Sequence, residues 1–342
     1  MGTTAFAFGA CLVAGGFLAL EDAYPRYAVA PETVLKREYK SATNLESTPA
    51  KMYLDGEEVP TEGHGVVRLE VEDSRVITFT DTIDAVADGR PTKFAREFGE
   101  MENSATESVL ATPPGGTEDV KASTRERTSL LSGKTVRFTW DGAQEEYARA
   151  FEGADEAKES GEALLLEGLE PDAEWLPLLE DGPREKGASF ELDPKLFERI
   201  QYPVGELHWV VEGKDADPVS KSINEQLSEN LEGEAKATWQ GAREVEGREL
   251  GVYAIEADLK SRAEAETPDG AETRGVELEV EYEGEILWDL AAGRLAGYAF
   301  EADVRSVIST ERAMETPKGK REVRQVFDLR GTAKHTLTVT VE

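Results

Sequence analysis

Hydrophobic and polar residues alternate along most of the chain, and the longest such run spans residues 276–308. From Val276 to Tyr282 every second residue is apolar, and the residues between them are glutamates. A period of two indicates a β-strand with one buried face and one face in water. The apolar positions continue through Trp288 and return from Tyr298 to Ile308 after a turn. The pattern therefore predicts a long β-hairpin with Trp288 on its buried face.

Shorter alternating runs predict that antiparallel strands make up most of the remaining chain. They occur at residues 67–71, 77–85, 136–140, 147–151, 253–259 and 335–341. The pair Asp141-Gly142 between two of these runs is a strong signal for a tight hairpin. We therefore expect a mainly β protein of the α+β class.

The length of the longest strand predicts that the sheets are curved. A straight strand from Val276 to Leu290 would span about 50 Å, whereas a compact globule of this chain length is only about 40 to 50 Å across. Strands of this length must bend, and we interpret Gly284 and Gly297 as bulge or bend points. We expect long, curved antiparallel sheets that resemble a half-barrel or an open barrel.

Proline-initiated segments replace the alternation between residues 153 and 233. In Asp193-Pro194 and Asp217-Pro218 the proline would be the first residue of a helix. The backbone N–H at that position has no partner within the helix, so proline, which lacks the N–H, is tolerated there. The predicted domains are thus a first antiparallel β module at residues 33–152, a short helical connector at 153–233 and a second antiparallel β module at 234–342. The sequence leaves open whether the two modules form one sheet or two.

An apolar run at residues 5–20 predicts that the chain is exported. Its length fits the core of a signal peptide better than a transmembrane helix. We assign residues 1–20 as a signal peptide or an N-terminal anchor and residues 21–32 as a linker. Lipidation of Cys11 is a third possibility for this segment. The expected location is periplasmic or in the cell envelope, with any membrane attachment made through the N-terminal segment alone.

The net charge of the chain limits the classes of partner that it can bind. It carries 70 acidic and 38 basic residues, a net charge of −32. Such a chain repels the phosphates of nucleic acids and the surface of anionic membranes. We expect a soluble monomer, and adaptation to high salt or the collection of cations are alternative explanations of the charge. The single cysteine excludes an internal disulfide and a cysteine-based zinc site.

No motif in the sequence predicts catalysis, a cofactor or a metal. The histidines His64, His208 and His335 lie far apart, and none has a second His or Cys at ligand spacing. Surface or packing roles are expected for them. With 70 acidic residues, any pair of carboxylates could be nominated for acid–base chemistry, so their abundance carries no signal. We expect a protein that is not an enzyme, and the alternative is a hydrolase whose carboxylates lack a recognisable motif.

Aromatic residues of the predicted hairpins suggest one binding surface. A half-closed sheet with aromatic side chains on its inner face could hold an apolar ligand, although core packing is the more common role of such residues. The candidates are Trp140, Tyr147, Phe151, Trp288, Tyr298 and Phe300. A carrier of an apolar ligand in an open barrel is therefore a further alternative function.

Three segments together resemble a family of exported proteins of unknown function from planctomycete-type bacteria. They are residues 88–96, with the sequence DGRPTKFAR, residues 133–141, with the sequence GKTVRFTWD, and residues 284–294. The resemblance spans most of the chain after the N-terminal segment, and its motifs are turn and strand features. It implies an exported β protein and no particular site residue. Our leading expectation is thus an exported envelope or periplasmic β protein with a structural or binding role and an unknown partner.

Overall fold

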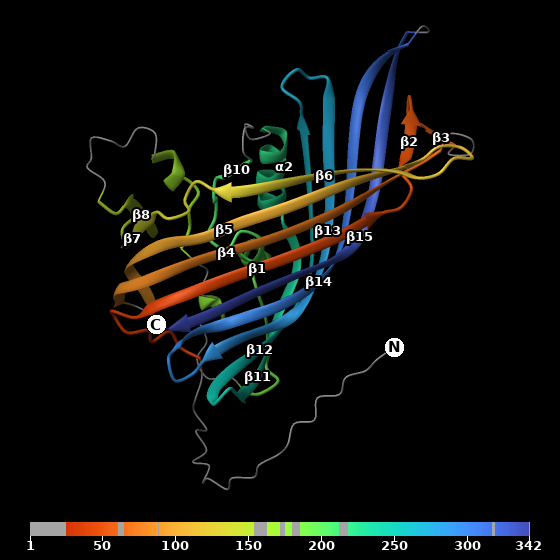
Figure 1. The fold of residues 1–342 in the computed structure, drawn as a ribbon. Coiled ribbons are helices and arrows are strands. Elements are labelled where there is room, and N and C mark those ends of the chain that lie inside the picture. Colours follow the sequence, from red (N-terminus) through yellow and green to blue (C-terminus); the bar gives the residue numbers. More distant parts are fainter. Residues whose placement is uncertain are drawn as a thin grey trace.

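A single antiparallel sheet forms the body of the protein (Figure 1). The computed structural model describes residues 25–60, 65–87, 89–153, 163–171, 175–179, 185–211, 218–316 and 319–341. Its 15 strands follow the main order β10-β6-β5-β4-β1-β15-β14-β13-β12-β11-β9, with β2, β3, β7 and β8 attached at the side. The expectation of a mainly β fold with long, curved antiparallel strands is confirmed.

The first half of the chain supplies eight strands. They are β1 (Val34–Ser47), β2 (Lys51–Leu54), β3 (Glu57–Val59), β4 (Val66–Ala87), β5 (Arg90–Thr112), β6 (Asp119–Ser129), β7 (Thr135–Asp141) and β8 (Glu146–Phe151). The hairpin of β7 and β8 turns at Asp141-Gly142, as predicted. The last part of the chain supplies β11 (Glu232–Val245), β12 (Arg248–Glu266), β13 (Glu272–Asp289), β14 (Arg294–Thr316) and β15 (Gly319–Val341).

The two predicted modules share one sheet, because the first long strand pairs with the last. β1 and β15 run antiparallel from the pair Leu35 and Val341 to the pair Ser47 and Leu329. On its other side β1 pairs with β4. The sheet therefore continues without a break from the N-terminal to the C-terminal strands, and no separate core divides them.

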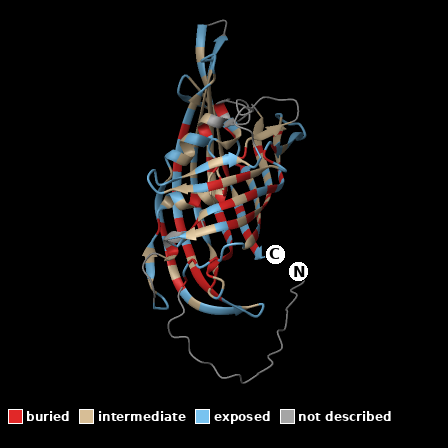
Figure 2. Cartoon of the chain, turned by 90° about the vertical axis from the view of Figure 1, so that its left-hand side faces the viewer, coloured by how far each residue is buried: buried red, intermediate tan, exposed pale blue. Residues whose placement is uncertain are grey.

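The sheet curls into a half-barrel, so that β4–β6 and β11–β13 cross one another on opposite sides of a concave face (Figures 1 and 2). Bulges interrupt the register in β4–β5, in β11–β12 and in β13–β14. The predicted bulge at Gly297 is confirmed, because the register shifts between the pairs of Leu287 and Trp288. The register runs through Gly284 without a shift, so no bulge forms there. That glycine instead admits the Phe300 ring, since a Cβ atom on it would lie 2.6 Å from Phe300 Cδ1.

The connector crosses the concave face and forms both edges of the sheet. It contains the 3₁₀ helices η1 (Ala163–Leu166), η2 (Leu176–Leu179) and η3 (Pro194–Phe197), the strands β9 (Ser189–Glu191) and β10 (Trp209–Val211), and the helices α1 (Glu198–Gln201) and α2 (Pro218–Glu229). β9 pairs with β11 at one edge, and β10 pairs with β6 at the other. The predicted start of a helix at Pro194 is observed as η3, where the Asp193 side chain accepts a hydrogen bond from Lys195 N. Much of the described part of the connector is thus irregular, and α2 is the one helix of several turns within it.

One hydrophobic core joins the connector to both halves of the sheet. Trp175 packs against Tyr298 and Phe300, with ring centroids 6.2 and 6.0 Å apart. Phe197 packs against Tyr282 at 5.4 Å. Figure 2 shows the buried residues gathered in the middle of the curled sheet, with exposed residues toward the strand tips. Because the connector supplies the second layer, the single sheet buries its inner face without a partner sheet.

The residues before β1 close one end of the half-barrel. Residues 1–24, which include the predicted signal segment and Cys11, lie outside the described residues. From residue 25 onward the predicted linker is packed: Tyr27 and Val29 are buried, and Ala28 N donates to the Gly293 carbonyl at 2.8 Å. Trp288 Nε1 donates to the Arg26 carbonyl at 3.3 Å. The segment therefore belongs to the folded unit.

Candidate functional site

A row of polar side chains crosses the otherwise apolar inner face where three strands meet. Ser41 on β1 stands opposite Arg75 on β4 and opposite His335 on β15. All three occupy inward positions of their strands, in line with the buried residues Tyr39, Ile77 and Leu337 two positions away. The sheet pairing thus brings together an arginine and a histidine that are far apart in the sequence.

These residues line a small pocket beside the connector. Its lining residues are Tyr39, Lys40, Ser41, Arg75, Ile77, Ile200, Gln201, Pro203, Tyr298, His335 and Thr336. The pocket has a volume of about 10 Å³, which is enough for about one water molecule or one ligand oxygen. It therefore suits the terminal group of a ligand, with the rest of that ligand lying outside it.

Arg75 holds the connector side of this pocket. One of its terminal nitrogens, Nη1, donates to the Gln201 carbonyl at 2.7 Å, and the guanidinium lies 6.0 Å from the ring centroids of Tyr202 and Trp209. Arg75 Nε is buried and has no hydrogen-bond partner among the residues that the structure describes. Within the described residues, no carboxylate lies within the 4.0 Å of an ion pair with Arg75. Within these residues Arg75 thus makes a hydrogen bond to one carbonyl and no ion pair.

His335 lies next to this uncompensated charge. Its side chain is buried, and its ring centroid is 6.0 Å from that of Tyr282. In the described part of the chain its Nδ1 atom has no hydrogen-bond partner. Burial, and secondarily the positive charge of Arg75, lower the pKa of His335 from 6.5 to about 4. The imidazole is consequently neutral at pH 7, so it can offer one N–H donor and one acceptor.

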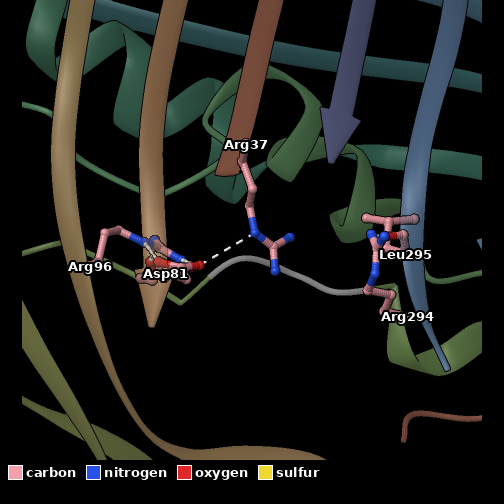
Figure 3. Close-up of polar contacts among 6 residues, drawn as sticks. Arg37, Asp81, Arg96, Arg294 and Leu295 are labelled. Carbon is pink, nitrogen blue, oxygen red and sulfur yellow. Dashed lines mark hydrogen bonds and ion pairs between the residues drawn. The ribbon is translucent and has the colours of Figure 1, made fainter. Parts of the chain in front are cut away.

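In a second polar cluster on the inner face, two buried arginines share one aspartate. Arg96 donates from Nε and Nη2 to the two carboxylate oxygens of Asp81, at 2.7 and 2.9 Å (Figure 3). Arg37 Nε lies 3.3 Å from Asp81 Oδ2. The Arg96 guanidinium stacks over the Phe79 ring at 4.0 Å and donates from Nη1 to the Glu170 carbonyl at 3.2 Å. This cluster ties β1, β4 and β5 to the connector.

A further buried arginine stands at the turn between β13 and β14. Arg294 donates from Nη1 to the Leu295 carbonyl at 3.2 Å, and its Nη2 lies 3.8 Å from Asp289 Oδ2 (Figure 3). Asp289 Oδ1 also accepts a hydrogen bond from Ala292 N at 2.9 Å. These contacts shape the turn on which the N-terminal segment rests.

The six aromatic candidates do not converge on one surface. Trp288, Tyr298 and Phe300 are buried in the core, 0, 5 and 1 % exposed. The other three lie on the β7–β8 hairpin, where they are partly buried. Tyr147 there packs against Trp140 with ring centroids 5.0 Å apart, and the Arg90 guanidinium lies 4.7 Å from the Trp140 ring. The first three lie inside the core of the half-barrel, and Tyr147 and Phe151 pack against that core from the β7–β8 hairpin.

The structure describes one of the two remaining histidines. His64 lies outside the described residues, and His208 Nε2 is 3.3 Å from the Glu167 carbonyl in the connector. No group of three or more His, Cys, Asp or Glu residues that could hold a metal ion occurs in the described part of the chain. Within the same residues, no helix is long and apolar enough to span a membrane.

Sequence reasoning missed Arg75 as a site residue, although the pattern contains a signal for it. In an alternating strand, a charged residue at an inward position breaks the rule that apolar residues face the core. Arg75 precedes the inward residues Ile77 and Phe79, and Arg96 stands between the inward residues Phe94 and Phe98. Such residues mark buried ion pairs or ligand contacts, and only the structure separates the two cases.

The comparisons with known proteins give no family for this chain. No protein-family model matches it, and no curated protein matches it. Among solved structures, OccK7 (OpdD) of Pseudomonas aeruginosa matches with 8 % identity and a TM-score of 0.17, covering 90 % of this chain and 99 % of that one. An outer membrane channel of Pseudomonas putida F1 matches with 8 % identity and a TM-score of 0.17, covering 96 % and 100 %. These scores are too low to support a shared fold or a function.

Proposed function

We propose that this protein is an exported, non-catalytic binding protein of the cell envelope, and that its ligand has an apolar part that lies on the concave face of the sheet. The observation that carries the proposal is the continuous apolar inner face, which runs across both halves of the chain and, in the described residues, is covered by the connector and by the segment before β1. The resemblance to exported proteins of planctomycete-type bacteria is in line with this proposal and stays an expectation.

The way in which the connector is attached supports a binding role. Its main-chain hydrogen bonds to the sheet lie at the two edges, through β9 and β10. Between them, sheet side chains donate to connector carbonyls: Arg75 to Gln201, Arg96 to Glu170 and Tyr253 to Leu178. A cover held by side-chain packing and a few such bonds separates from a sheet at lower cost than a paired strand.

Part of the inner face is only half covered, which also supports ligand binding. Leu45, Val71 and Val304 form an apolar strip on neighbouring strands, and each is partly exposed. Leu45 stands opposite Val71 and opposite Gly331, and Val304 stands opposite Gly331. The glycine leaves the middle of the strip without a side chain. We call these three residues the apolar strip.

The acidic residues support a non-catalytic role. A general acid needs a raised pKa near neutral pH, whereas hydrogen bonds lower the pKa values of the carboxylates Asp55, Asp269 and Asp328 below the ordinary 3.8. For Asp328 the largest cause is the hydrogen bond from Arg305. Many acids form exposed pairs of this kind, which suits a solvated outer surface.

The binding role is tested with a neutral apolar fluorophore, N-phenyl-1-naphthylamine, titrated into the full chain. We expect saturable binding that Leu45→Asp abolishes, because a charge on the apolar strip is incompatible with an apolar ligand. Thr332→Asp, on the exposed face of β15, is the control and leaves binding unchanged. Absence of saturable binding, or equal binding by both variants, would contradict the proposal.

The catalytic alternative and export are tested separately. Incubation with chromogenic esters and glycosides should give no turnover above buffer, and turnover that saturates with substrate would favour the hydrolase alternative. Fractionation of the source cells followed by N-terminal sequencing should find the protein outside the cytoplasm without its apolar N-terminal run. An intact Met1 terminus on cytoplasmic protein would contradict export.

A further inference from the structure

We infer that Arg75 and His335 form a binding site for one carboxylate group at the inner face of the half-barrel. The site deepens the proposed function, on which its apolar part rests: a ligand that places a carboxylate here and a hydrocarbon chain on the apolar strip is a monocarboxylic amphiphile. The carboxylate part of the inference rests on the pocket alone.

Two unpartnered donors carry the inference. Arg75 Nε always bears a hydrogen, and His335 Nδ1 bears one in one of the two neutral tautomers. Both atoms are buried without a partner, and both residues line the same pocket. Buried polar atoms in folded proteins are nearly always satisfied, so a pair of unsatisfied donors around one small space indicates a bound acceptor. One anionic oxygen accepts from both.

The charge of the pocket indicates an anion rather than water. Arg96, on the inner face of the next strand, is neutralised by two hydrogen bonds to Asp81. Arg75 has no carboxylate within ion-pair distance among the described residues; Asp73, two positions along β4, keeps its charge and accepts a hydrogen bond from the Asn103 amide at 2.9 Å. His335 is neutral beside it, so Arg75 presents to the pocket a guanidinium with which a bound carboxylate would pair.

Three acids, Asp73, Glu198 and Glu206, act on Tyr202, whose ring the Arg75 guanidinium faces, and none of them is within ion-pair distance of Arg75 among the described residues. Ser41 from β1, Gln201 from the connector and Tyr298 from β14 are neutral. Lys40 also borders the pocket, and its amino group pairs with Glu38 on the outer face of β1. The available space of about 10 Å³ admits about one oxygen, which excludes phosphate or sulfate as a fully enclosed ligand and fits the end of a carboxylate.

The apolar strip lies at a distance from the pocket that the hydrocarbon chain of a carboxylate ligand can span. On β1, Leu45 lies on the same face as Ser41 with Thr43 between them, and on β4, Val71 lies on the same face as Arg75 with Asp73 between them. A residue four positions along a strand is about 13 Å away. A hydrocarbon chain of about ten carbons covers that distance from the carboxylate to the strip.

The experiment compares decanoate, 1-decanol and formate at pH 7.5 in chloride-free buffer, because chloride competes for the same donors. Displacement of N-phenyl-1-naphthylamine reports the two long-chain ligands. Nitrogen-15 NMR of the His335 ring, assigned with His335→Phe, reports formate, which has no apolar chain. The variants are Arg75→Gln and, as a charge-matched control, Arg330→Gln, whose side chain is 67 % exposed on the outer face of β15.

We expect wild-type protein to bind decanoate about tenfold more tightly than 1-decanol, since a hydrogen bond to a charged acceptor is stronger than one to a neutral hydroxyl. Arg75→Gln should remove this preference and leave the affinity for 1-decanol unchanged, and Arg330→Gln should preserve it. Formate should shift the His335 signal with saturation in the wild type and not in Arg75→Gln.

The outcomes separate the two proposals. Equal affinities for decanoate and 1-decanol in the wild type, or a preference that survives Arg75→Gln, would overturn the carboxylate site and leave the apolar binding role standing. Failure of both long-chain ligands to bind, together with a saturable formate shift, would overturn the proposed function and support the site. An unshifted His335 signal would mean that the pocket holds water only, and would overturn the site.

Discussion

Truncation of Trp288 should destabilise the whole protein, because this side chain fills the closed end of the half-barrel. Its side chain is 0 % exposed, and its register partner across the sheet in β12 is Gly251, which leaves space for the aromatic rings around it. Its Nε1 atom also donates to the Arg26 carbonyl at 3.3 Å, which fastens the segment before β1. Trp288→Ala therefore removes both core packing and an attachment point of the N-terminal segment.

The magnitude follows from burial. Replacing a fully buried Trp by Ala typically costs about 3 to 5 kcal/mol, and the lost hydrogen bond contributes about 1 kcal/mol of that loss. A domain is stable by only about 5 to 15 kcal/mol, so the variant should lose a large share of its free energy of unfolding. Because β1 pairs with β15 in one sheet, the loss should appear in a single transition of the whole chain.

The matched control is Glu279→Ala on the outer face of the same strand. The Glu279 side chain is 60 % exposed, and its carboxylate lies 3.1 Å from Arg305 Nη1. Arg305 keeps two hydrogen bonds of 3.0 Å to Asp328 when this partner is removed. An exposed pair of this kind contributes about 0 to 1 kcal/mol, so the control should change the free energy of unfolding by no more than about that amount.

Urea melts followed by far-ultraviolet circular dichroism measure both variants without depending on tryptophan fluorescence. A fall of several kcal/mol for Trp288→Ala, with little change for Glu279→Ala, is the expected result. Equal shifts for the two variants would refute the register of β13. Two separate transitions in Trp288→Ala would refute the conclusion that the two halves unfold as one sheet.

Three further perturbations test the inner face. Asp81→Asn should lower the free energy of unfolding by about 3 to 5 kcal/mol in urea melts, because it leaves buried arginine charge uncompensated; a loss below 1 kcal/mol would show that the cluster is solvated. The pKa of His335 is about 4 in the folded protein and 6.5 ordinarily, so folding favours its neutral form. Its contribution to the free energy of unfolding is therefore fully present above pH 6.5 and is lost as the pH falls to 4. Wild-type protein should therefore lose about 3 kcal/mol more than His335→Gln across this window, and parallel pH profiles would contradict the lowered pKa. Gly284→Ala should lower the melting temperature by several degrees, since its Cβ would lie 2.2 Å from the Ala299 carbonyl oxygen; an unchanged melting temperature would show that the strand shifts freely.

The class of fold and the facing of many side chains could be predicted from the sequence, because both depend on local alternation. A strand with one buried face must repeat every two residues, so Trp288 inside and Glu279 outside follow from the sequence itself. Hairpin turns at Asp141-Gly142 and at residues 290–293 are also local, since two strands joined by a short turn pair next to one another. The bulge at Gly297 follows from strand length and glycine position.

Tertiary structure alone decided how the strands join and what the inner face holds. Every alternating strand offers the same main-chain donors and acceptors, so the period of two does not determine that β1 pairs with β15. It also does not determine that the connector reaches both edges of the sheet. That pairing places Arg75 beside His335 from opposite ends of the chain. An inward arginine looks the same in the sequence whether a carboxylate faces it, as Asp81 faces Arg96, or a pocket does, as at Arg75. The difference is a contact between distant strands, and such contacts exist only in the folded sheet.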